Sequence, residues 1–208
     1  MGPALEAVPD DGAPPDAADV VVIGGGIIGV AAAWRLARLG HSVALVEKGR
    51  VGAEQSSRNW GWCRVQGRDP DEIPLAQASL RLWDEVAGPA GFRRTGIIRA
   101  TKDPAQLAEW VRWAEMARGF QQHTAVLSAA EVRALLPGNA EPFIGGLHTP
   151  TDGRAEPARG APAVAAAARA AGRVTLHQGC AARGLETTGG RVSAVVTEAG
   201  RIRCGAAI

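Results

Sequence analysis

A run of glycines between residues 24 and 29 has the spacing of a phosphate-binding turn. The run reads GGGIIG, so Gly24, Gly26 and Gly29 form the pattern G-x-G-x-x-G. In this pattern the first glycine permits a tight turn, the second lets the backbone approach a pyrophosphate, and the third lets a helix pack on a strand. The N–H groups of Ile27 and Ile28 would open that helix, where anions bind. The alternative is a glycine-rich turn in an ordinary α/β protein, and the residues that follow argue against it.

A carboxylate follows at the distance expected for a ribose contact. Glu47 lies 18 residues after Gly29, near the roughly 20 residues typical of a dinucleotide site. A carboxylate accepts hydrogen bonds from free ribose hydroxyls and repels a 2′-phosphate. The pair of features therefore favours FAD or NAD over NADP.

The stretch SSRNWGWCR, at residues 56–64, combines polar and aromatic side chains that no helix or strand requires. Placed just after a second strand, it would lie beside a bound dinucleotide. Hydrogen-bond donors to a pyrophosphate and a ribitol chain would come from Ser56, Ser57, Arg58 and Asn59. Gly61 would let the backbone pass close to an isoalloxazine ring. A simple NAD-dependent dehydrogenase, the less favoured alternative, does not need such a loop.

These residues need a strand–helix–strand frame to position them. Residues 20–23 form a continuous apolar run, typical of a strand buried on both faces. Residues 27–39 suit a helix that Gly40 ends, and residues 42–46 form a second apolar strand. Because the links are short, the strands must be parallel and joined by a right-handed crossover.

The rest of the chain mixes helices and strands. The patterns predict helices over residues 71–87, 104–118 and 157–171, and a further helix after Ser128, which forms a capping box with Glu131. They predict strands over residues 92–100, 143–148, 173–177, 181–187, 191–197 and 202–208.

The combined motifs resemble a known family. The segment VVVIGGGIIGVAAAWRLARLGHSVALVEKG, followed by SSRNWGW, resembles the FAD-dependent D-amino acid oxidase and dehydrogenase superfamily, which includes glycine and sarcosine oxidases. Within it, EQSSRNWGWCRVQGRDPDEIPLA resembles the flavoprotein subunits of opine oxidases. The resemblance implies that FAD is lined by Gly24, Gly26, Ile27, Ile28, Gly29, Glu47, Lys48, Ser56, Ser57, Arg58, Asn59, Gly61 and, through its backbone, Ala182.

The resemblance also implies a domain plan and a mode of attachment. We expect an α/β fold: a Rossmann-like FAD-binding domain in two segments, 19–87 and 151–208, with an α+β substrate domain inserted at 88–150. Residues 1–18, rich in Pro, Ala and Asp, read as a disordered lead-in. Some members bind flavin covalently through a loop histidine, but Asn59 and Trp60 stand there, so we expect non-covalent FAD.

Composition excludes several other classes. The formal charge of +2 gives no reason to propose a nucleic acid or an anionic membrane as partner. The three cysteines show no metal-ligand spacing, so we expect no metal, no disulfide framework and a cytoplasmic protein. The longest apolar stretch, residues 20–34, is too short for a membrane span.

Other polar residues leave alternatives open. Arg64, with Arg68, would suit a substrate carboxylate, although exposed structural arginines are commoner. Trp60 and Trp62 would face the flavin or substrate, or pack in a core or interface. No residue stands out as catalytic.

We expect the protein to oxidise the C–N bond of an opine, a D-amino acid or an N-alkyl glycine by hydride transfer to flavin. A partner subunit or a separate electron acceptor would fit this chemistry. Because the apolar run at 202–208 ends without a turn, we also expect the chain to be the first part of a longer protein. The alternative is an inactive fragment of the FAD fold or an accessory subunit.

Overall fold

The computed structural model describes residues 4–208, which form two compact units. Unit 1 contains the chain up to Trp60, with Gly88–Gly91 and Glu156–Ile208; unit 2 contains Gly61–Ala87 and Phe92–Ala155. Residues 61–87, which we predicted in the FAD-binding segment, therefore belong to unit 2. The physical reason is a long-range pairing, since β3 (Trp62–Cys63) joins β7 (Gly153–Arg154) in an antiparallel ribbon.

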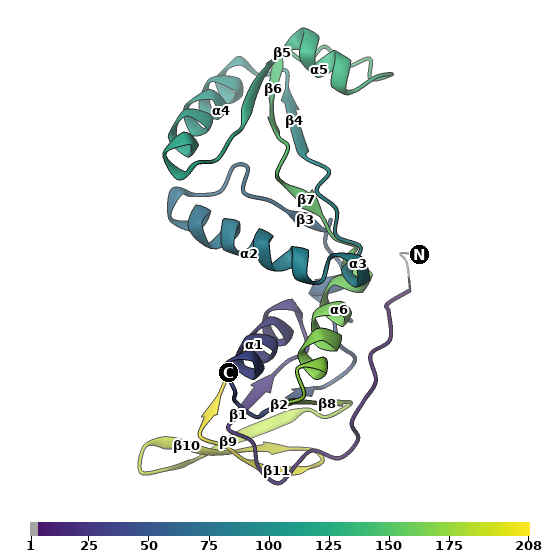
Figure 1. Cartoon of the computed structure of the whole chain (residues 1–208), viewed down its shortest axis with the longest axis vertical. Helices are drawn as coiled ribbons and strands as arrows, with labels where there is room; N and C mark the ends of the chain where they lie inside the picture. The colour runs from purple at the N-terminus through teal and green to yellow at the C-terminus, as the bar shows by residue number, and fades with distance from the viewer. Residues whose placement is uncertain (1–3) are drawn as a thin grey trace. The chain divides into compact units, whose positions relative to one another are not determined.

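Unit 1 is built on a parallel sheet with the order β12-β1-β2-β8. The strands span Val20–Ile23 (β1), Val43–Glu47 (β2), Val174–Gln178 (β8) and Ala206–Ala207 (β12). Helices α1 (Ile27–Arg38) and α6 (Pro157–Ala170) pack against each other on one face, and a sheet of β9 (Ala182–Thr188), β10 (Arg191–Thr197) and β11 (Gly200–Arg203) covers the other (Figure 1). The predicted α/β class is confirmed.

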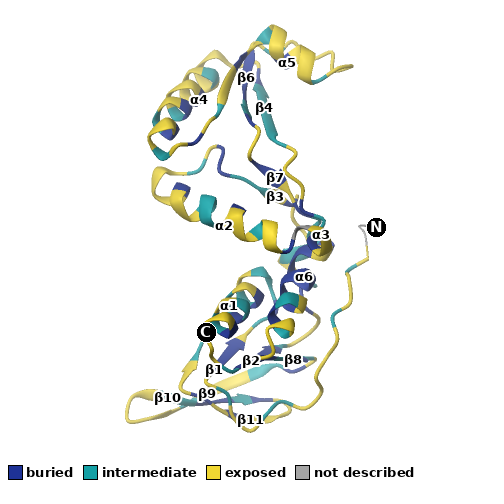
Figure 2. Ribbon diagram, viewed as in Figure 1, coloured by how far each residue is buried: buried dark blue, intermediate teal, exposed yellow. Residues whose placement is uncertain are grey.

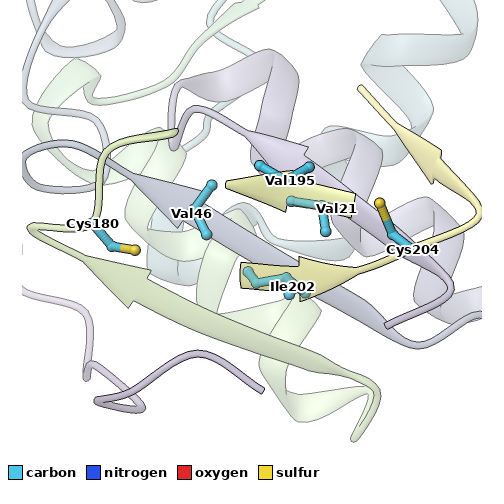
Figure 3. Packing of buried hydrophobic residues seen from close by; sticks show 7 residues of the cluster. Val21, Val46, Cys180, Val195, Ile202 and Cys204 are labelled. Atoms are coloured by element: carbon cyan, nitrogen blue, oxygen red, sulfur yellow. The ribbon is translucent and has the colours of Figure 1, made fainter. Parts of the chain in front are cut away.

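The core of unit 1 follows from the alternation of side chains along its central strands. Val21 on β1 and Val46 on β2 pack against Val195, Ile202 and the other members of a buried cluster (Figure 3). Neighbours along the same strands, such as Leu45, are equally buried. Both faces of the parallel strands are therefore covered, as their unbroken apolar sequence predicts.

The strand predicted over residues 202–208 is wrong, because the chain changes sheets there. Ile202 pairs with Val195 in the antiparallel sheet, whereas Ala206 pairs with Val20 in the parallel sheet. Between them the Gly205 N–H donates to the Asp19 carbonyl at 3.1 Å. Apart from Arg203 and Gly205 the segment is apolar, and both of its halves read as strand, so hydrophobicity alone does not reveal the change of sheet.

The prediction of a disordered lead-in is also wrong for residues 4–18, while residues 1–3 lie outside the described part. The Asp11 N–H donates to the Leu176 carbonyl at 2.9 Å, and its carboxylate accepts from the Leu176 N–H at 2.8 Å. Asp11 also forms an ion pair with Arg169. Because β8 is the edge of the parallel sheet, an extended segment can satisfy its unpaired backbone groups.

Unit 2 has a three-stranded antiparallel sheet, β4 (Ile97–Thr101), β6 (Gly145–Thr149) and β5 (Ala125–Ser128), in that order. Helix α4 (Pro104–Ala117) packs on this sheet, and α5 (Ala129–Leu135) begins at the predicted capping box. The unit also contains α2 (Ile73–Glu85), which is mostly exposed or half-buried (Figure 2), with Ile73 and Leu80 buried. Shorter helical segments of the chain are α3 (Ala87–Ala90) and turns at Gln55–Ser57, Pro70–Glu72 and Arg118–Phe120.

The strand predicted over 92–100 begins only at Ile97. Gly96 has a φ of +69°, and its N–H donates to the Asp152 carbonyl at 2.9 Å. This left-handed backbone interrupts the extended run that its apolar residues suggested.

Candidate functional site

A cavity of about 430 Å³ lies in unit 1, at the carboxyl ends of β1 and β2. Ligands of open α/β sheets bind at this edge. The lining consists of the strand ends, the glycine turn, the loop after β2 and the start of β9; its residues are Ile23, Gly24, Gly26, Val46, Glu47, Lys48, Arg50, Gly52, Ala53, Glu54, Gln55, Ser56, Ala181, Ala182 and Arg183.

The glycine turn at the cavity depends on the absence of side chains at two positions. Gly24 has a φ of +108°, and its N–H donates to the Val46 carbonyl at 2.8 Å. A Cβ added to Gly29 would lie 1.9 Å from the Gly24 carbonyl oxygen. The turn and the packing of α1 against it thus match the roles expected of the first and third glycines.

The N-terminus of α1 meets the cavity without an acidic residue of its own in the first turn. Gly26 provides no side-chain cap, and no acidic residue lies in the first turn of the helix. The Ile27 N–H donates to the Ser56 Oγ at 2.8 Å, so a hydroxyl from the following loop caps the helix. The Ile28 side chain is exposed. The remaining partial positive charge suits an anionic group.

Glu47, at the end of β2, organises the turn from the other side. Its Oε2 accepts from the Gly25 N–H at 2.6 Å, and its Oε1 accepts from the Gly49 N–H at 2.7 Å. A carboxylate has about four acceptor positions, so each oxygen can accept a further hydrogen bond. Glu47 can therefore hold the loop and bind hydroxyl groups at the same time.

Charged side chains surround the cavity. Lys48 and Glu54 form an exposed ion pair at 2.8 Å, which raises the pKa of Lys48 and lowers that of Glu54. Arg50 and Arg183 also line the cavity. With Glu47, the lining carries three cations and two carboxylates, and Arg183 is itself paired with Glu198 outside the lining.

A distant segment reaches the cavity because backbone bonds tie it to the end of β2. The Cys180 N–H donates to the Glu47 carbonyl at 2.9 Å, and the Gly179 N–H donates to the Gly49 carbonyl at 3.0 Å. These bonds place Ala182, which we predicted from the resemblance, and its neighbour Arg183 at the cavity.

Part of the predicted site does not line the cavity. The Ser57 hydroxyl donates to the Glu54 carbonyl at 3.1 Å, and the Asn59 amide donates to the Ser56 carbonyl at 2.8 Å, so both brace the loop itself. Arg58 is exposed, and Gly61 belongs to unit 2. The sequence reasoning missed Arg50, Gly52, Ala53, Glu54, Gln55 and Arg183, although their position just after β2 or at the start of β9 was a usable signal.

In unit 2, Arg64 lies directly after β3. Its guanidinium donates to the Gln66 carbonyl and lies 5.9 Å from the centre of the Trp62 ring. Burial and then the charges of Arg68 and Arg99 lower the pKa of Arg64.

Trp60, Trp62 and the neighbouring Cys63 show no feature that suits them to catalysis. Trp60 and Trp62 are 73% and 51% exposed, so neither lies in the core of its unit. Burial raises the pKa of the Cys63 thiol to about 11, which keeps it protonated and unreactive near neutral pH. Residues 4–208 contain no cluster of three His, Cys, Asp or Glu side chains suited to a metal, and no helix among them could span a membrane.

The sequence and the structure were each found to be similar to those of known proteins. The sequence profile of the FAD dependent oxidoreductase family, DAO, matches residues 19–208. The chain is 27% identical over 196 residues to glycine oxidase of Geobacillus kaustophilus, covering 85% of this chain and 52% of that protein. It is 30% identical over 197 residues to sarcosine oxidase subunit beta of Rhizobium meliloti, covering 89% and 47%.

Among solved structures, the chain is similar to L-amino acid deaminase from Proteus myxofaciens, determined in complex with anthranilate. The TM-score is 0.90 with 31% identity, over 100% of this chain and 48% of that one. The chain thus spans about half the length of these three relatives.

Proposed function

Because this chain belongs to the FAD dependent oxidoreductase family, we propose that the whole protein oxidises the C–N bond of an amino acid or secondary amine. FAD is the cofactor of this family. The observation that carries the proposal is the cavity of unit 1, where the glycine turn, the α1 N-terminus and Glu47 converge at the carboxyl ends of two parallel strands. This is the arrangement that dinucleotide binding requires.

The residues present fit FAD in their chemistry. The first turn of α1 offers positive backbone groups to a pyrophosphate, and Glu47 retains acceptor positions for ribose hydroxyls. Ser56, whose oxygen already accepts from Ile27, keeps its hydroxyl hydrogen for a phosphate oxygen. Ala182 also lines the cavity, and its backbone would contact the adenine.

The flavin, when bound, accepts the hydride that leaves the carbon of the substrate. The chain contributes binding and orientation. Gly24 and Gly29 fix the turn, Glu47 anchors the nucleotide end, and the loop from Gln55 to Ser57 holds the start of α1 in place. Arg64 is our candidate for a group that binds the substrate.

The names of the relatives support an amine as the substrate class. Glycine oxidase, sarcosine oxidase and L-amino acid deaminase all take their names from amino acids or N-methylated amino acids. The likeness to a beta subunit of sarcosine oxidase also supports the proposal that the whole protein works with a partner subunit.

The test is anaerobic mixing of the full-length, FAD-loaded protein with matched substrate pairs. Amino acids, N-alkyl glycines and opines should bleach the visible absorbance of the oxidised flavin. Their 2-hydroxy acid counterparts, which carry a C–O bond in place of the C–N bond, should not. Bleaching by hydroxy acids alone would refute the proposal.

We propose in addition that the flavin is bound without a covalent link, because Asn59 and Trp60 occupy the loop position at which some family members carry a histidine. Acid precipitation of the full-length protein should release yellow colour into the supernatant. Colour that stays in the pellet would contradict this.

A further inference from the structure

A strap formed by residues 5–12 lies along the β8 edge of unit 1. Its two carboxylates accept hydrogen bonds from alternate N–H groups of that edge: Asp11 from Leu176 at 2.8 Å and Asp10 from Gln178 at 2.7 Å. The Asp11 N–H donates in return to the Leu176 carbonyl at 2.9 Å. Because side chains and not a further strand satisfy these edge donors, the strap can open locally while the sheet stays intact.

Gln178 connects the strap to the loop that follows β2. Both ends of its side-chain amide are used: the Nε2 donates to the Val8 carbonyl at 3.0 Å, and the Oε1 accepts from the Val51 N–H at 2.9 Å. An amide that is bonded at both ends is held in one orientation. The strap therefore orients the acceptor that receives the Val51 N–H.

The strap contacts the same loop a second time, through Leu5. A Cβ built on Gly52 would lie 3.2 Å from the Ala161 Cβ on α6 and 3.5 Å from the Leu5 Cδ1. Leu5 is half-buried, whereas its neighbours Ala4 and Glu6 are exposed. The Leu5 side chain and α6 therefore pack together against this glycine.

The loop that the strap contacts supports the glycine turn at the cavity. The Gly52 N–H donates to the Gly25 carbonyl at 2.9 Å, and a Cβ built on Gly25 would lie 3.1 Å from the Val51 Cγ2. Val51 is buried, while Arg50 and Gly52 line the cavity. A continuous series of contacts thus joins the strap, through Gln178 and the loop, to the turn.

We propose that docking of the strap and binding of the dinucleotide stabilise each other, and that Gln178 is the positioning residue that couples them. The inference rests on the assignment of the cavity to FAD in the proposed function above. A docked strap holds residues 50–52 in the arrangement that receives the cofactor, and a bound cofactor holds residues 50–52 against the strap. Because coupling is reciprocal, the factor by which the strap raises the affinity for FAD equals the factor by which FAD favours the docked strap.

The first test measures the Kd for FAD by fluorescence titration of the full-length apo-protein. Replacing residues 5–12 by a Gly/Ser sequence of the same length should raise this Kd about five- to tenfold. Gln178→Met, which removes both amide hydrogen bonds and nearly keeps the size of the side chain, should produce part of this increase, because Leu5 still contacts the loop.

Gln77→Met is the matched control for the point variant. Gln77 is also a half-buried glutamine, and its amide donates to a main-chain carbonyl, that of Phe120 at 2.9 Å, but it lies in unit 2. This variant should leave the Kd for FAD unchanged. Circular dichroism of each variant shows whether it is folded.

The second test measures amide hydrogen exchange in the strap, with and without FAD, by mass spectrometry of the N-terminal peptide. The Glu6 and Asp11 N–H groups donate to carbonyls outside the strap, so their exchange reports undocking. Saturating FAD should slow this exchange by the same factor of about five to ten. A purely structural role of Gln178 would not make this protection depend on FAD, and Gln178→Met should remove most of it.

Three results would overturn the proposal: an unchanged Kd for FAD in the strap replacement, strap exchange that FAD does not alter, or equal weakening of FAD binding by Gln178→Met and Gln77→Met. Neither measurement needs turnover. Coupled binding of FAD and the strap without flavin bleaching by amines would therefore contradict the proposed function and leave this inference standing, whereas bleaching with no coupling would do the reverse.

Discussion

Replacing Glu47 by Gln should weaken FAD binding and loosen the glycine turn together. In the structure each carboxylate oxygen accepts one backbone N–H, from Gly25 at 2.6 Å and from Gly49 at 2.7 Å. Glutamine keeps one acceptor oxygen but turns an NH₂ donor toward the other N–H. At least one charge-assisted hydrogen bond is therefore lost, and a donor faces a donor.

The magnitude follows from that loss. A hydrogen bond to a charged group contributes about 1.5–3 kcal/mol, and Glu47 is partly exposed, so the lower end applies. We expect the unfolding free energy of the FAD-free protein to fall by about 1.5 kcal/mol. A similar loss at the ribose hydroxyls would raise the Kd for FAD about tenfold.

The assay is a fluorescence titration of FAD into the apo-protein, together with denaturant unfolding in the absence of FAD. Glu186→Gln is the matched control: Glu186 is partly exposed, like Glu47, and pairs with Arg201 on the antiparallel sheet, and its side chain does not line the cavity. An unchanged Kd for FAD in Glu47→Gln would refute the assignment of Glu47. A raised Kd in both variants would show that general charge, and not this position, controls binding.

Three further changes test other parts of the structure. Gly29→Ala should lower the free energy of unfolding, measured in denaturant, by at least about 3 kcal/mol. The reason is that the new Cβ would lie 1.9 Å from the Gly24 carbonyl oxygen. An unchanged free energy would show that α1 does not pack as described. Asp11→Asn should lower the Tm at neutral pH, because the ion pair with Arg169 holds the pKa of Asp11 below its ordinary value of 3.8. The ionised carboxylate thus stabilises the fold above that pH, and the difference in Tm should vanish as the pH falls through the lowered pKa; a constant difference would contradict this. Cys63, whose pKa burial raises to about 11, should react slowly with iodoacetamide at about pH 8 and faster only in strong alkali, as followed by mass spectrometry; rapid alkylation at neutral pH would show the thiol to be exposed.

The sequence by itself determined the features that depend on neighbouring residues. The apolar run at 20–23, the glycine spacing from Gly24 to Gly29 and the carboxylate at Glu47 predict the strand, turn, helix and strand that the structure contains. The capping box of Ser128 and Glu131 likewise marks the start of α5. Each signal lies within a few residues of the feature it predicts, so backbone geometry and side-chain periodicity suffice to read it.

The tertiary structure decided what depends on partners far apart in the chain. Asp11 is ordered because β8 happens to be a sheet edge, and Ala182 reaches the cavity because Cys180 donates to the Glu47 carbonyl. The segment 202–208 divides between two sheets that both accept apolar residues. Arg99 meets Arg64 only after β4 pairs within its sheet. Composition and periodicity describe which face of an element is apolar, but they do not specify which distant segment will cover it.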